Sequence, residues 1–227
     1  TQGGVTTGVA YLPANTPNIW LMPNLLLQKF PAPDFIATTK VKWNVDSTTW
    51  KNKRAGLLVM GNDYAALTIS RDEQGYKISQ VVCKKAPAGN AEQIIAERRL
   101  PGNTVYLRVQ VNAPEARCRF SYSIDSVHFI PIGESFLAQP DTWIGAKVGL
   151  FCSSINPARR GGYADFDWFQ IEKPYTFRRD TSYTLRSAYE NIRKDFPMVQ
   201  PIHPELPKGV RAHQHVVYAR IGVGVVN

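Results

Sequence analysis

The sequence predicts an all-β protein, a sandwich of two antiparallel sheets, on three observations. Short runs rich in β-branched and aromatic residues follow one another from residue 25 to residue 172. Gly, Pro, Asn and Asp separate these runs, and no stretch between them has helical periodicity. Apolar residues make up 44% of the 227 residues, which is enough for a hydrophobic core between two sheets.

The predicted strands follow from this punctuation, and some of them alternate cleanly between apolar and polar side chains. In the stretch 104–112 the odd positions are apolar, whereas Arg108 and Gln110 point to the other face. In 117–125, Cys118, Phe120 and Tyr122 share one face in the same way. In chain order, the predicted strands are 25–30, 35–43, 55–60, 65–71, 76–84, 92–99, 104–112, 117–125, 130–134, 146–151 and 164–172.

The composition changes after residue 173. Residues 174–227 carry 8 Lys/Arg against 4 Asp/Glu, and prolines interrupt the stretch 197–207. Because proline fixes φ and removes a backbone donor, this part is expected to be extended linker. We therefore predict a β-sandwich at residues 1–173 and a Pro-rich tail at 174–227, which docks on the sandwich or leads to a further domain.

The charge and cysteine patterns restrict the class of partner. A net charge of +9 is compatible with nucleic acid or an acidic polymer. However, the signs are mixed, as at Arg71, Asp72 and Glu73, and no nucleic-acid motif is present, so no nucleic-acid partner is expected. The sequence contains no window of about 20 uncharged apolar residues, so no transmembrane helix is predicted. The three cysteines are far apart without a CxxC pair, which favours buried free thiols.

The N-terminus bears on where the protein acts. It begins Thr1-Gln2-Gly3-Gly4, without an initiator Met, a basic region or an apolar signal core. This pattern is expected of a protein that stays inside the cell, or of a mature or excised chain, and the missing Met favours the latter.

Several segments carry a family resemblance. One is Ala55-Gly56-Leu57-Leu58-Val59-Met60-Gly61-Asn62-Asp63-Tyr64-Ala65, and the others are 23–33, 35–41, 118–123, 143–151 and 162–169. In this order they resemble the C-terminal β-sandwich of family 43 glycoside hydrolases of the β-xylosidase type, over roughly residues 9–173. More faintly, 215–222 is similar to the first strand of α/β-hydrolase esterase domains that follow such sandwiches.

The resemblance implies a concanavalin-like jelly roll that is not catalytic. In that family the sandwich packs on a five-bladed catalytic propeller, shapes the entrance to its pocket, and in related modules is classed as a xylan-binding domain. It therefore implies xylan or xylo-oligosaccharide and the catalytic domains of the same polypeptide as partners. It also implies a secreted or periplasmic location, with the cytoplasm as the alternative.

The pattern of acidic residues does not favour catalysis by this chain. Some concanavalin-like glycosidases place acids at i, i+2 and i+5 of one strand. Asp165 and Asp167 fill the first two positions, but the third is Gln170, which cannot exchange a proton as a carboxyl does. No GxSxG motif is present either. The two carboxylates are expected to be neutralised by backbone groups or an Arg, with a structural calcium ion as the alternative.

Sugar binding would need exposed aromatic faces that stack on the C–H face of a pyranose. Trp50 is the leading candidate because it lies in the polar stretch 46–54, where nothing nearby in the sequence would bury it. Phe166 and Trp168 are predicted to point to one face of their strand, opposite to Phe169. A basic loop adds cations that would clamp uronic acids or face a catalytic partner. The candidate binding residues are Trp50, Tyr64, Trp143, Tyr163, Trp168, Arg159 and Arg160.

Three functions remain open at this stage. The first is a non-catalytic xylan-binding accessory module of a multidomain plant-cell-wall enzyme. The second is an interdomain scaffold without sugar affinity. The third is hydrolysis of the β-xylosidase or arabinofuranosidase type, which would require a catalytic propeller in the same polypeptide.

Overall fold

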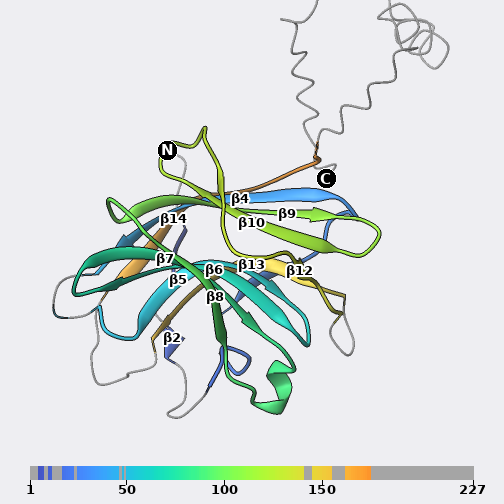
Figure 1. The fold of residues 1–227 in the computed structure, drawn as a ribbon, viewed down its shortest axis with the longest axis horizontal. Helices are drawn as coiled ribbons and strands as arrows, with labels where there is room; N and C mark the ends of the chain where they lie inside the picture. The colour runs from blue at the N-terminus through green and yellow to red at the C-terminus, as the bar shows by residue number, and fades with distance from the viewer. Residues whose placement is uncertain are drawn as a thin grey trace, which may run out of the picture. The chain divides into compact units, whose positions relative to one another are not determined.

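Two antiparallel sheets form the body of the protein in the computed structural model, which describes residues 5–7, 10–11, 17–22, 25–45, 48, 50–140, 145–154 and 162–174. Figure 1 shows the two layers, with β4, β9 and β10 in one and β5, β6, β7 and β8 in the other. Sheet A has the order β1 (Val5–Thr7), β14 (Tyr163–Glu172), β4 (Phe35–Asn44), β9 (Thr104–Asn112), β10 (Arg117–Ser123) and β11 (Ile130–Pro131), with β12 (Phe136–Leu137) also beside β10. Sheet B has the order β2 (Ala10–Tyr11), β13 (Lys147–Ser154), β5 (Lys53–Met60), β6 (Tyr64–Asp72), β7 (Gly75–Cys83) and β8 (Gln93–Arg99), with β3 (Leu26–Lys29) also beside β13.

The predicted fold class is confirmed. The predicted strands appear as β3 to β11, β13 and β14, with ends that differ by a few residues, and the stretch 130–134 forms only the two-residue β11. β1, β2 and β12 were not predicted. One 3-10 turn, η1 (Ala86–Ala88), joins β7 to β8. None of the helical segments among the described residues is long and apolar enough to cross a membrane. The predicted tail, apart from residue 174, lies outside the described residues.

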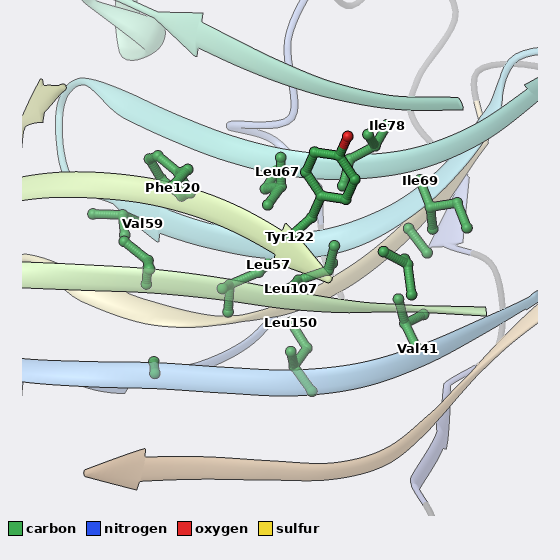
Figure 2. Packing of buried hydrophobic residues seen from close by; sticks show 14 of the residues in the cluster. Val41, Leu57, Val59, Leu67, Ile69, Ile78, Leu107, Phe120, Tyr122 and Leu150 are labelled. Carbon is green, nitrogen blue, oxygen red and sulfur yellow. The ribbon is translucent and has the colours of Figure 1, made fainter. Parts of the chain in front are cut away.

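The main core lies between the sheets. The alternating strand β9 buries Val105, Leu107, Val109 and Val111 completely, as its pattern predicts. Figure 2 shows Val41 and Leu107 of sheet A in one cluster of buried side chains with Leu57 of sheet B. The three cysteines are buried free thiols, as expected: Cys83, Cys118 and Cys152.

A second apolar cluster lies on the opposite, outer face of sheet B. Leu58, Met60 and Phe151 would be open to solvent there if the strand surface were bare. Residues 17–22, which we call the strap, cover them by packing Ile19 and Met22 against this face. The strap therefore covers part of the outer face of this sheet.

Polar contacts hold the strap in place. The side-chain amide of Asn18 donates to the Ala86 oxygen at 3.1 Å and to the Asn90 oxygen at 2.7 Å. The backbone N–H of Ile19 donates to the hydroxyl of Tyr64 at 3.0 Å. Asn18 and Ile19 are both buried, so these bonds satisfy groups that water cannot reach.

Candidate functional site

A groove with a volume of about 530 Å³ lies on the outer face of sheet B, beside the strap. Its floor follows from the register of the strands, which brings the small side chains of Thr68, Ser70 and Ser79 together on this face. The longer side chains of Arg54, Lys77 and Glu97, together with those of Trp50 and Ile94, form the walls. The two rows that cross β5, β6, β7 and β8 are Arg54-Ser70-Lys77-Arg99 and Gly56-Thr68-Ser79-Glu97.

One wall of the groove contains a largely buried ion pair. Arg54 binds Glu92 through two bonds, from Nη1 to Oε2 at 2.5 Å and from Nη2 to Oε1 at 2.7 Å. The side chains are only 18% and 13% exposed. The hydroxyl of Tyr64 also donates to Oε1 of Glu92. Burial, followed by the charge of Glu92, raises the pKa of Tyr64 far above its usual value. Tyr64 is therefore a neutral donor that fixes this carboxylate.

A second charge network lines the β7–β8 side. Lys77 Nζ lies 2.9 Å from Glu97 Oε2 and 3.7 Å from Asp72 Oδ2, and Arg99 Nη1 lies 2.6 Å from Asp72 Oδ1. The Ser79 hydroxyl donates to Glu97 at 2.9 Å. The hydrogen bond from Arg99 lowers the pKa of Asp72. Burial alone would raise the pKa of Glu97, but the bonds from Lys77 and Ser79 outweigh it and leave it lowered. Both carboxylates are thus held in the ionised form.

These lowered pKa values predict that acid weakens the fold. A carboxyl with a lower pKa in the folded state stabilises the protein above its unfolded pKa, and this contribution is lost as the pH falls through the folded pKa. The melting temperature should therefore drop below about pH 4.5. The double variant Asp72→Asn/Glu97→Gln should lose less on the same acidification, measured by thermal unfolding between neutral and acid pH. Parallel pH profiles for the two proteins would contradict this.

Trp50 lines the groove, but it is not free of the core as the sequence suggested. Its ring is half-buried and packs against the main core cluster, and Lys51 Nζ lies 5.6 Å from its centroid. The expectation that nothing buries Trp50 was wrong in part, because the ring contacts core residues that are distant in the sequence. The remaining exposed part of the ring faces the groove region.

Tyr64 is not available to a ligand. Its side chain is 0% exposed because the strap covers it, so its prediction as a sugar-binding residue was wrong. Trp143, Arg159 and Arg160 lie outside the described residues, and their predicted role in binding stays a prediction.

Tyr163 and Trp168 lie on sheet A and not in the groove. A bulge at Asp167 shifts the pairing, so that Phe166 pairs with Val41 but Trp168 pairs with Lys40. Phe166 consequently points into the core, whereas the half-buried Trp168 lies with its ring 6.2 Å from that of Tyr106. The prediction that Phe166 and Trp168 share a face was wrong, because the extra residue reverses the alternation between them. Tyr163 is 47% exposed.

The two acids of β14 each have a partner on β4. Asn44 Nδ2 donates to Asp165 Oδ2 at 2.8 Å, and Lys40 Nζ lies 3.0 Å from Asp167 Oδ2. The hydrogen bond to Asp167 raises the pKa of Lys40. Among the described residues no group of three or more His, Cys, Asp and Glu is placed to hold a metal ion. A calcium ion at Asp165 and Asp167 stays a prediction.

Sequence reasoning missed the charged walls of the groove. Arg54 and Glu92 are 38 residues apart, and nothing in the local pattern pairs them. Glu97 belonged to a predicted strand whose faces were not assigned. Ser79 of β7 pairs with Glu97 of β8, and this pairing places the Glu97 carboxylate at the groove. The alternation within one strand does not show how it is paired with its neighbour, so the sequence could not predict this position.

Comparisons with known proteins bear on the fold. A family model described as the β-xylosidase C-terminal concanavalin A-like domain matches residues 11–172. No protein among those with curated functions matches the sequence.

Solved structures share the same architecture. The GH43 BlXynB protein from Bacillus licheniformis is 19% identical with a TM-score of 0.59, and the match covers 75% of this chain and 32% of that one. A bifunctional GH43-CE protein from Bacteroides eggerthii is 21% identical with a TM-score of 0.60, covering 72% of this chain and 22% of that one. A functionally unknown protein from Saccharomyces cerevisiae is 15% identical with a TM-score of 0.53, covering 75% of this chain and 87% of that one. The chain thus spans a third or less of the length of the two GH43 structures.

Proposed function

Because the chain belongs to the family of β-xylosidase C-terminal concanavalin A-like domains, we propose that it is a non-catalytic accessory module that binds xylan or xylo-oligosaccharide in the groove of sheet B. Membership of the family agrees with the resemblance seen in the sequence. The groove is the observation that carries the proposal.

The groove combines the groups that pyranose recognition uses. Trp50 supplies part of an apolar aromatic surface for the C–H face of a sugar ring. Thr68, Ser70 and Ser79 supply hydroxyls along the floor, and charged groups on the walls are already fixed by ion pairs. Such a set of preorganised polar groups beside an aromatic ring orients a ligand without reorganising on binding.

The same groups support binding without hydrolysis. A general acid has to be protonated at the working pH, so its pKa must be raised. Asp72 and Glu97 instead have lowered pKa values, and Glu92 is engaged by Arg54 and Tyr64. The catalytic step is therefore proposed to lie in another domain of a parent glycoside hydrolase, with an esterase domain as a further member. Since xylan lies outside cells, the parent is proposed to be secreted or periplasmic.

A scaffold without sugar affinity is the second candidate function. Exposed apolar side chains gather around the end of β10, where Val127 is 71% and Ile124 56% exposed, with Ile130 on the strand beside it. An apolar surface of this kind suits contact with a neighbouring domain of the same polypeptide.

Affinity electrophoresis in gels containing neutral arabinoxylan tests the proposal. The parent protein should be retarded, and Trp50→Ala should bind about tenfold more weakly because the stacking surface is lost. Since Trp50 also packs on the core, Ser70→Tyr provides a second variant that fills the groove from its floor without touching the core.

One control variant makes the result specific. Trp168→Ala removes an aromatic ring from the opposite sheet and should leave the retardation unchanged. A loss confined to Trp168→Ala would move the sugar site to sheet A. An absence of retardation for the parent protein would favour the scaffold.

A further inference from the structure

The groove contains both signs of charge, and its cations are already engaged. Arg54 is bound at both terminal nitrogens by Glu92, and Lys77 is bound by Glu97 and Asp72. Lys53 is only 2% exposed. Each of these contacts removes a donor that an anionic ligand would need.

The remaining groove cation among the described residues, Arg71, is held by an aromatic ring and a backbone oxygen. Arg71 lies with its guanidinium carbon 5.3 Å from the ring centre of Tyr76. Its Nη1 donates to the backbone oxygen of Val45 at 3.3 Å. One terminal nitrogen of this cation is therefore engaged by the backbone and its Nε is buried, which leaves it less able to form a two-pronged contact with a carboxylate.

The hydroxyls of the floor present lone pairs to the groove. Ser79 Oγ donates its proton to Glu97, and Thr68 Oγ1 donates to the backbone oxygen of Ser79 at 3.3 Å. With their protons used inside the protein, these oxygens are left as acceptors. The groove therefore suits ligands that bring O–H donors, such as neutral sugars, and not ligands that bring only acceptors.

We propose that the groove selects neutral xylan segments and disfavours segments that carry glucuronic acid. A uronate would have to displace Glu92 or Glu97 from its cation, or lie against these carboxylates as a like charge. This selectivity rests on the proposed function of the groove. The net charge of +9 would by itself favour acidic ligands. At physiological salt this attraction is screened over about 8 Å, so the contacts inside the groove decide the preference.

Isothermal titration calorimetry at physiological ionic strength tests the selectivity with two ligands of equal backbone length. One is a linear neutral xylo-oligosaccharide and the other bears a single glucuronic acid. The neutral ligand should bind about tenfold more tightly. In Glu97→Gln the groove loses a carboxylate and Lys77 loses its nearer partner, so the affinity for the acidic ligand should rise several-fold.

Glu73→Gln is the matched control. It makes the same change in net charge at an exposed position of the β6–β7 turn that does not line the groove. Its ligand preference should equal that of the parent protein, and an equal gain in both variants would overturn the inference in favour of a long-range charge effect. Acidic and neutral ligands binding equally well to the parent protein would also overturn it, while leaving the proposed function standing. Binding of neither ligand would overturn the proposed function and the inference together.

Discussion

Replacing Gly56 by alanine is expected to lower the free energy of unfolding by more than about 3 kcal/mol, beyond the usual effect of overpacking. A Cβ at this position would lie 2.1 Å from the backbone oxygen of Leu67 and 3.0 Å from its carbonyl carbon. The obstacle is the backbone of β6, which cannot rotate away as a side chain can. β5 and β6 both lie inside sheet B, so neither has room to shift without breaking pairing on its other side.

Urea unfolding of three alanine variants measures this effect. In Gly149→Ala the Cβ would lie 1.9 Å from the Leu26 oxygen, but Leu26 belongs to the short edge strand β3, which can detach. A smaller loss is expected there than for Gly56→Ala. Gly102→Ala is the control, because nothing lies within 4 Å of its Cβ. Equal stability of the Gly56 and Gly102 variants would show that β5 and β6 are not packed as described.

The second large effect is expected for Tyr64→Phe, which should lower the free energy of unfolding by about 2–4 kcal/mol. The hydroxyl both accepts the Ile19 N–H, at 3.0 Å, and donates to Glu92. Its removal leaves the N–H of the fully buried Ile19 without an acceptor and withdraws one donor from a largely buried carboxylate. Because the ring itself is retained, the loss reports these polar contacts and not the packing.

Urea unfolding at neutral pH, together with amide hydrogen exchange at Ile19, measures this second effect. Faster exchange at Ile19 is expected, since the strap loses the bond that ties it to β6. Tyr76→Phe is the matched control: it keeps the ring that faces Arg71, and no hydrogen bond of its hydroxyl is found in the described part of the chain. It should change stability by less than about 0.5 kcal/mol. Unchanged exchange at Ile19 in Tyr64→Phe would contradict the role given to the hydroxyl.

The fold could be predicted from the sequence because the long strands carry their own pattern. Each apolar position from Val105 to Val111 is buried, as alternation requires. Strands of two or three residues, such as β1 and β2, contain too few positions for a period to be seen. They exist because β14 and β13 offer free edges, and that is a tertiary property.

The surroundings of the candidate site residues were predicted less well, because they depend on contacts that are not local. Tyr64 was expected to face a ligand, but a segment more than 40 residues away covers it. Trp168 was predicted to share a face with Phe166, because the bulge at Asp167 that separates them cannot be read from alternation. The pairing of Arg54 with Glu92 depends on where the loop before β8 lies over the sheet. Family resemblance did not help here: Gly56 and Gly149, which lie in the resembling segments, serve close strand contacts and not a ligand.

The strap has a practical consequence for protein engineering. The strand pattern alone suggests that the domain starts near residue 25. A designer who transplants this module onto another enzyme would therefore begin the graft there. Such a truncation would remove the residues that cover Leu58, Met60 and Phe151. It would leave an exposed apolar surface beside the groove. The graft would then tend to aggregate, and its non-specific adsorption could be mistaken for polysaccharide affinity. Chimeric enzymes that include this sandwich should therefore retain the chain from before residue 17.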